Sequence, residues 1–378
     1  MNRLVIIGNG FDLAHGLKTS YMDFINWYWE QRVISFVNNR TRVSEDCLCR
    51  ITIKEDSELS SWSHFIYINS NFKDIYGNRK YSGSEIIKEI RDTPKDFTFE
   101  CCPLFSSMLD SIDTKGWVDI ENDYYRCLKK AMFDPLCGYT FGEINRQLAF
   151  LQNKLVEYLR TQKTENIKKE LLDAIANVWD IRDISFEGKK KAIDSVDIPR
   201  YKIESNLYNE EDRKKMYPSK IMLLNFNYTD TAAQYDLPNL THNYIHGELS
   251  KEKEIIFGYG DELDKDYKEL LDMNDNELLK YAKNVKYLET SHYRKMLNFI
   301  YAGPFQVFIM GHSCGNSDRT LLNTVFEHEN CVSIKPFYYK KANGTDNYLE
   351  LVQNISRNFT DMKLFRDRVV NKEQCLTM

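Results

Sequence analysis

Long hydrophobic runs are missing from the sequence. No stretch of the 378 residues approaches the roughly 18 consecutive apolar residues that a membrane-spanning helix needs. The first apolar run, residues 4–7, ends at a glycine and is shorter than the roughly 7 to 15 residues of a signal-peptide core. Only 16 glycines and 8 prolines are present, which excludes collagen-like and low-complexity chains. We therefore expect a globular protein without a membrane span or an export signal.

An excess of positive charge is also missing. The chain has 51 Lys and Arg against 56 Asp and Glu, a formal net charge of −5, which disfavours wholesale wrapping of nucleic acid. Its nine cysteines are odd in number and follow no regular spacing, as is typical of thiols in a reducing compartment. We expect a cytoplasmic protein of two domains, or of one large domain that carries an insertion.

Short apolar runs rich in β-branched residues predict the buried strands of a parallel sheet. The first run is 4–7, and the others come only after residue 218: 220–225, 242–245, 254–258, 305–310 and 331–337. Helical patterns lie near them, at 19–40, 288–301, 318–328 and 346–359. This alternation predicts an α/β fold, a Rossmann-like parallel sheet with helices on both faces.

Residues 41–218 have a different character, being charged and aromatic. Apolar residues recur at three- and four-residue steps between 143 and 162, so we expect a large, mainly helical insertion. The Rossmann-like domain would then consist of residues 1–40 and 219–378. Residues 189–219 lack periodicity and are interpreted as a linker or mobile loop. Asp119 and Glu121 could form a paired-carboxylate site, but carboxylates at the start of a helix more often complement its dipole, which is the favoured interpretation.

Residues directly after the predicted strands are the first candidates for ligand contacts, because parallel strands present their ligand crevice at their carboxyl ends. The first such loop contains Gly8, Asn9, Gly10, Phe11 and Asp12, with Gly16 further on. Glycines let backbone N–H groups approach a phosphate, and a following helix adds positive potential. The spacing is not G-x-G-x-x-G, so a tight structural turn is an equally good interpretation.

Two more candidates follow the next strands. Asn227 lies in the loop after 220–225, where a structural turn is the default role for asparagine. His246 and Gly247 follow the strand at 242–245, and a histidine in that place can reach a cleft and titrate near neutral pH. His242 lies about 13 Å from His246 along an extended strand, too far for a shared ion, so we predict no metal site.

The fourth loop, Gly311-His312-Ser313-Cys314-Gly315, matches the G-x-S-x-G pattern of serine hydrolases. A hydrolase of that type needs an acid and then a histidine after the serine, and only His328 follows, inside the next predicted helix. A serine hydrolase therefore stays the weaker alternative. Ser313 and Asp318 are interpreted as nucleotide contacts, with the polar residues before the helix as its cap.

Taken in order, these loops resemble the AbiH family of bacteriophage abortive-infection proteins. The resemblance is carried by residues 8–17, 19–24, 117–121, 225–229, 245–247, 256–258, 311–313 and 317–318. It spans both ends of the chain and is sparse through the insertion. More remotely, the spacing of Gly8, Gly10 and Gly16, together with Asn227 and His246-Gly247, is similar to sirtuin-like NAD-binding domains.

The sequence departs from the sirtuin pattern in two ways. Asp12 stands where that pattern has a small hydroxyl residue, and a carboxylate beside a pyrophosphate is repulsive unless it turns to a ribose hydroxyl. The zinc ribbon is missing, because the sequence has no pair of C-x-x-C motifs. The resemblance therefore implies an NAD-hydrolysing relative and not a deacylase.

On this resemblance the protein is an anti-phage effector that binds NAD or a related nucleotide and hydrolyses its nicotinamide–ribose bond. Asn227 would orient a water molecule and His246 would accept a proton. The nucleotide would be held by Gly8, Asn9, Gly10, Phe11, Asp12, Gly16, Gly247, Gly311, Ser313 and Asp318. A nucleotide sensor or scaffold without catalysis is the alternative. A phage-derived trigger or defence partner and a homo-oligomer are further expectations from the resemblance.

Overall fold

The computed structural model describes residues 1–68, 82–115, 119–134, 136–164 and 166–378. The chain forms two compact units. The first, the sheet unit, comprises Met1–Lys18, Gln162–Asp275 and Tyr281–Met378, and the second comprises Thr19–Thr161 and Asn276–Lys280. The predicted domain organisation, with an insertion at 41–218, stays a prediction.

Five strands form the parallel sheet of the sheet unit. They are β1 (Asn2–Ile7), β5 (Ile221–Asn225), β6 (Leu240–Tyr244), β7 (Phe305–Met310) and β8 (Cys331–Phe337), in the spatial order β6-β5-β1-β7-β8. The central strand β1 pairs with β5 and β7, so that Val5 lies opposite both Leu223 and Phe308. The predicted Rossmann-like α/β fold is confirmed.

Helices alternate with these strands. The α-helices of the sheet unit are α1 (Asn9–Ala14), α8 (Lys169–Ala176), α9 (Gly188–Asp194), α10 (Arg200–Glu204), α11 (Glu210–Lys215), α12 (Tyr267–Asp272), α14 (Lys283–Lys286), α15 (His292–Tyr301), α16 (Arg319–Phe326), α17 (Tyr348–Arg357) and α18 (Met362–Arg368). Its 3-10 turns are η2 (Ile181–Asp183), η3 (Thr231–Gln234), η4 (Glu252–Glu254), η5 (Tyr287–Glu289), η6 (Asn316–Asp318) and η7 (Lys372–Gln374). Over the described ranges, no helix combines the length and the apolar character needed to cross a bilayer.

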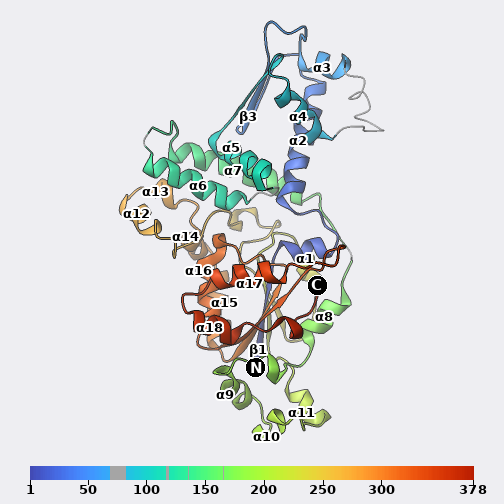
Figure 1. Ribbon diagram of the computed structural model, residues 1–378, viewed down its shortest axis with the longest axis vertical. Coiled ribbons are helices and arrows are strands. Elements are labelled where there is room, and N and C mark those ends of the chain that lie inside the picture. The colour runs from blue at the N-terminus through green and yellow to red at the C-terminus, as the bar shows by residue number, and fades with distance from the viewer. Residues whose placement is uncertain (69–81, 116–118, 135, 165) are drawn as a thin grey trace. The chain divides into compact units, whose positions relative to one another are not determined.

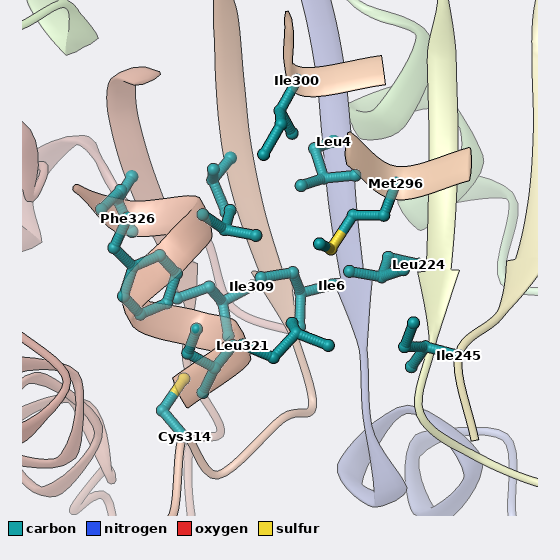
Figure 2. Close-up of a cluster of buried hydrophobic side chains, with 14 of the residues drawn as sticks. Leu4, Ile6, Leu224, Ile245, Met296, Ile300, Ile309, Cys314, Leu321 and Phe326 are labelled. Carbon is teal, nitrogen blue, oxygen red and sulfur yellow. The ribbon is translucent and has the colours of Figure 1, made fainter. Parts of the chain in front are cut away.

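The core lies on both faces of the sheet, which explains why β1 is apolar throughout. Leu4 and Ile6 pack with side chains of α15, α16 and α17 on one face (Figure 2). Val5 and Ile7 pack on the other face with residues of α8 and η3. Figure 1 shows α15–α18 and α8 around the strands of the sheet. Burial on both faces is the pattern of a parallel sheet covered by helices.

Two predictions for the sheet unit are wrong. Residues 254–258 do not form a strand: the chain continues from the end of η4 as an irregular segment. This segment lies so close to Tyr281 that a Cβ on Gly258 would be 2.0 Å from the Tyr281 carbonyl oxygen. Residues 189–219 are not a structureless linker, because they contain most of α9 and all of α10 and α11. Ala192, Ile193 and Ile203 from this segment are buried in a small core with Trp179.

The second unit contains more than helices. Its helices are α2 (Tyr21–Val37), α3 (Trp62–Ile68), α4 (Gly83–Asp92), α5 (Pro103–Lys115), α6 (Ile120–Phe133), α7 (Phe141–Leu159) and α13 (Asn276–Leu279). The strands β2 (Val43–Glu45), β3 (Cys49–Ile53) and β4 (Phe97–Cys101) add an antiparallel sheet that the sequence analysis missed. As predicted, Asp119 and Glu121 lie at the start of a helix: Asp119 caps α6 by accepting from the Asn122 N–H, and Glu121 is in its first turn. Trp117 and Val118 lie outside the described residues.

Candidate functional site

The chain reverses its course across the sheet between β1 and β7. From β1 it passes to β5 and β6 on one side, and it then returns to β7 and β8 on the other. Ligands of open parallel sheets bind outside the carboxyl ends of the strands at this point of reversal. The loops after β1, β5, β6 and β7 all begin at this edge, and the residues predicted for the site lie in these loops, in the α1 and η6 elements that continue them, or just after α1.

The loops after β1 and β7 pack backbone against backbone. The Gly10 N–H donates to the Gly311 carbonyl at 2.8 Å, and the Gly8 N–H donates to the Met310 carbonyl at 3.2 Å. Gly311 has a φ of +76°, and a Cβ there would lie 2.0 Å from the Phe11 nitrogen. The close approach of these loops therefore requires glycine. In this arrangement the N–H groups of Gly8 and Gly10, which were expected to hold a pyrophosphate, donate to carbonyls of the protein instead.

Asn227 links the loop after β5 to the loop after β1. Its Nδ2 donates to the Gly8 carbonyl at 3.0 Å. Its backbone N–H donates to Oδ1 of Asn225 at 2.9 Å, which closes a local turn. The Asn227 side chain therefore faces the glycine loop, and its amide nitrogen is already engaged.

Asp12, in α1, is a buried acid beside Asn227. The Thr229 hydroxyl donates to Asp12 Oδ2 at 2.5 Å, and the residue is 1% exposed. Burial raises the pKa of Asp12 to about 6, although the hydrogen bond from Thr229 and the polar side chains of Thr231 and Asn227 favour its ionised form. This carboxyl can therefore change its protonation state close to neutral pH.

His246 belongs to a second buried group, which is centred on Asp318. Its Nε2 lies 3.2 Å from Asp318 Oδ1 and 3.2 Å from the Tyr287 hydroxyl. The Lys283 ammonium donates to Asp318 Oδ1 at 2.8 Å, and His312 Nε2 lies 3.5 Å from Asp318 Oδ2. We call His246, Lys283, His312 and Asp318 the Asp318 cluster. All four are buried, and Lys283 is 0% exposed.

The charges of the Asp318 cluster depend on one another. Burial opposes the ionisation of Asp318, but Lys283 and His246 outweigh it and hold the pKa of this carboxyl well below its usual range. Burial, and then the adjacent Lys283 charge, lower the pKa of His246 to about 4. Near neutral pH the cluster therefore contains a carboxylate, an ammonium and a neutral imidazole at position 246.

Lys283 is brought to the cluster by the segment at residues 258–260. The Lys283 N–H donates to the Tyr259 carbonyl at 2.6 Å, and the Tyr259 N–H donates to the Tyr281 carbonyl at 3.1 Å. The near contact of Gly258 with Tyr281 lets the two segments lie this close. The 256–258 run, which carries part of the resemblance, therefore positions the buried lysine.

Asn227 and His246 follow neighbouring strands, but their side chains join different groups. The ring of Phe226 contacts both histidines of the Asp318 cluster, with centroids 5.0 Å from His246 and 4.3 Å from His312. In the portion of the chain that the structure describes, no hydrogen bond joins the side chains of Asn227 and His246. The edge thus has two buried polar groups, one at Asp12 and one at Asp318.

Three residues of the Asp318 cluster lie in loops that the sequence singles out. His246 was expected to reach a cleft and titrate near neutral pH, whereas it is buried and its pKa is lowered to about 4. Asp318 occupies the N-cap position of α16, as expected, yet its carboxylate is directed to the cluster and does not cap the helix. His312 was noted only as part of a loop. Lys283 was missed, and nothing in its short helix α14 distinguishes it from the many exposed lysines of the chain.

A comparison of the sequence with models of protein families identifies the family of this chain. A family model described as "Bacteriophage abortive infection AbiH" matches residues 4–339. The chain belongs to the AbiH family. This membership indicates a role in abortive infection, a defence against bacteriophage. No curated protein and no solved structure shows a significant match.

In this AbiH protein the loop after β7 does not form a nucleophile elbow. The non-glycine residue of this loop with a positive φ, +54°, is Cys314 and not Ser313. Ser313 is exposed, and none of the hydrogen bonds of the described residues joins it to a histidine. His328 instead accepts the Asn330 N–H at 3.1 Å. The arrangement gives no support to a serine hydrolase.

The remaining predicted residues lie at the same edge or beside it. Asn9 begins α1, and Gly16 follows the end of that helix with a φ of +85°. Gly247 follows His246 with a φ of +83°. Across the described ranges, no group of three or more His, Cys, Asp or Glu side chains is arranged to hold a metal ion.

Proposed function

We propose that this AbiH protein is a cytoplasmic effector of abortive infection that binds NAD or a related nucleotide at the carboxyl edge of its sheet and hydrolyses the nicotinamide–ribose bond. The observation that supports this best is the hydrogen-bonded pair of His246 and Asp318 at the point where the chain reverses across the sheet. Buried ionisable groups are costly for stability, and their concentration at such an edge is typical of functional sites.

The proposed reaction needs a positioned water molecule more than a strong acid. Water attacks the anomeric carbon of the ribose, the bond to nicotinamide breaks, and its electron pair neutralises the pyridinium. The products are ADP-ribose, neutral nicotinamide and one proton. The protein must orient the water molecule and accept this proton.

His246 is the proposed proton acceptor. An ionised Asp318 can only accept hydrogen bonds, so neutral His246 carries its proton on Nε2 and keeps a lone pair on Nδ1. Its low pKa, about 4, ensures that this lone pair is present at neutral pH. Asn227 would orient the water through Oδ1, because Nδ2 is bound to the Gly8 carbonyl.

A nucleotide sensor without catalysis is the second candidate, and a specific observation favours it. The N–H groups of Gly8 and Gly10 are bound within the protein, and Asn227, His246 and Asp318 are at most 9% exposed. A site in this state suits a protein that changes its packing when a nucleotide binds.

The decisive experiment measures NAD in phage-infected bacteria that express the full chain, so that the phage-derived trigger is present. We expect NAD to fall in cells with the unaltered protein, and the His246→Gln variant to slow the loss about 10²- to 10⁴-fold. His328→Gln is the matched control, because His328 lies in the sheet unit outside the cluster and should leave the loss unchanged. Constant NAD together with measurable binding of NAD to the purified protein would instead establish the sensor.

A further inference from the structure

A cavity of about 270 Å³ lies on one face of the sheet, and no residue of the Asp318 cluster lines it. Its lining includes Arg3 near the start of β1, Phe308 of β7 and Lys335 of β8. Lys335 lies opposite Phe308 in the sheet, and Arg3 precedes the end of β1 by about 13 Å of extended strand. The lining also includes Trp179, which follows α8, and Arg213, which lies in α11. The cavity is therefore separate from the Asp318 cluster.

Arg3 places a buried positive charge at this cavity. Its guanidinium lies 4.2 Å from the centre of the Phe308 ring, and the residue is 1% exposed. Nη1 donates to the Asn177 carbonyl at 2.6 Å and to the Ile175 carbonyl at 2.8 Å, and Nη2 donates to Gln306 Oε1 at 3.0 Å. All of these acceptors are neutral. They fix the orientation of the guanidinium without balancing its charge.

Two carboxylates, Asp180 and Asp183, also line the cavity, but each already has a cationic partner other than Arg3. Asp183, which favours the charged form of Arg3, already forms an ion pair with Lys335 at 2.8 Å. Asp180 is paired with Arg182 at 2.6 Å. Burial, opposed in part by Asp183, lowers the pKa of Arg3 to about 9. Exposed Arg213 adds another positive charge to the lining.

Two buried donors of the lining also lack acceptors. Neither Arg3 Nε nor Trp179 Nε1 has a hydrogen-bond partner among the described residues. A buried donor without an acceptor is destabilising, so such donors point to an acceptor that the protein chain does not provide. Oxygens of an anion would satisfy both donors and the charge.

We propose that this cavity binds a small organic oxyanion, a carboxylate or a phosphate ester on a flat apolar body. The oxygens accept from Arg3 and Trp179, and the apolar body packs against the rings of Phe308 and Trp179. The volume lies just below the roughly 300–1,000 Å³ of sites for drug-sized ligands, so it suits a single small molecule. This site is independent of the proposed NAD hydrolysis.

Calorimetric titration of the full chain tests the proposal with three probes of similar shape: phenyl phosphate, benzoate and neutral benzamide. We expect at least one of the two anions to bind and benzamide not to bind, and the stronger anion identifies the preferred oxyanion. Binding of neither anion at millimolar concentration, or equal binding of benzamide, would overturn the proposal. Competition with sodium chloride should weaken the binding of the anion.

Two variants locate the binding. Trp179→Phe keeps the aromatic ring and removes the N–H, and we expect it to weaken anion binding about threefold to tenfold. Arg213→Gln should weaken binding and reduce its dependence on salt. Trp27→Phe, in the second unit, is the control for the first substitution, and circular dichroism confirms that all variants are folded. Unchanged affinity in both Trp179→Phe and Arg213→Gln would show that the anion binds elsewhere and would refute the assignment.

Discussion

The Lys283 ammonium and the Asp318 carboxylate form an ion pair at 2.8 Å, in which the lysine side chain is completely buried. We predict that Asp318→Asn destabilises the protein by about 3–5 kcal/mol, because it leaves the buried ammonium without its counter-charge. Urea unfolding followed by circular dichroism measures this loss. The control is Glu157→Gln, which breaks the exposed pair of Lys154 and Glu157 and should cost less than about 1 kcal/mol.

The double variant Lys283→Met with Asp318→Asn refines this prediction. It removes both charges, so part of the stability that Asp318→Asn loses should return. If the double variant is as unstable as the sum of its single variants, the two charges do not compensate one another and the ion pair is not the source of the loss.

Asp12 should oppose stability as the pH rises. Its pKa is raised to about 6 in the folded protein, so the folded state holds a proton that the unfolded state releases above its ordinary value of 3.8. The contribution of Asp12 is therefore most favourable below pH 3.8 and is lost as the pH rises towards 6. We expect Asp12→Asn to raise the free energy of unfolding at pH 7 by about 1–3 kcal/mol. A loss of stability at pH 7 would show that the ionised carboxylate is needed.

His246 should have the opposite effect on the pH profile. Its pKa is lowered from 6.5 to about 4 in the folded protein, so its contribution is present above pH 6.5 and is lost as the pH falls to 4. His246→Gln should therefore flatten the rise of the unfolding free energy between pH 4 and 6.5 by up to about 1.4 kcal/mol per pH unit. Chemical unfolding at several pH values measures this slope. If the slope is the same in the variant, a group other than His246 is responsible for the pH dependence.

Gly311→Ala should be strongly destabilising. The new Cβ would adopt a positive φ and would also meet the Phe11 nitrogen at 2.0 Å, so we expect a loss of about 3 kcal/mol or more. Gly344→Ala separates the two causes. Gly344 has a similar φ of +84°, but a Cβ at this position would have no atom of the described residues within 4 Å, so its replacement should cost only about 1 kcal/mol. If both substitutions lower the free energy of unfolding equally, the packing of the two loops does not explain the effect of Gly311→Ala.

Ser313 offers a direct check on the hydrolase alternative. Because no histidine bonds to it within the described ranges, Ser313→Ala should not abolish protection against phage, as the loss of a catalytic nucleophile would. A fluorophosphonate probe should likewise fail to label Ser313, as shown by mass spectrometry of the protein. Labelling at this residue, with loss of protection in the variant, would restore the serine hydrolase.

The sheet could be predicted from the sequence because its strands are buried on both faces. The runs at 305–310 and 331–337 coincide with β7 and β8, since continuous apolar residues are needed where helices cover both sides. The strands β2, β3 and β4 were missed, because they are short and belong to a region in which helical periodicity dominates. Residues 254–258 resemble a strand in composition, but they pack against the Lys283 segment and not against a neighbouring strand.

The candidate site was predictable only where it follows strands. His246 and Asn227 come directly after β6 and β5, so topology brings them to one edge. Their separation into two groups depends on which way each side chain turns, and Phe226 and Asp318 decide this through contacts that are distant in sequence. Lys283 could not be predicted, because its burial results from the packing of an irregular segment.

The central position of β1 has a consequence for how the protein is made. Val5 lies between Leu223 and Phe308. β1 is synthesised first, but it cannot pair until the two distant segments that flank it in the native sheet have also been synthesised. Such a high contact order slows folding. A chain stopped before Phe305 would leave one edge of β1 unpaired, so we expect premature termination to yield an aggregation-prone fragment.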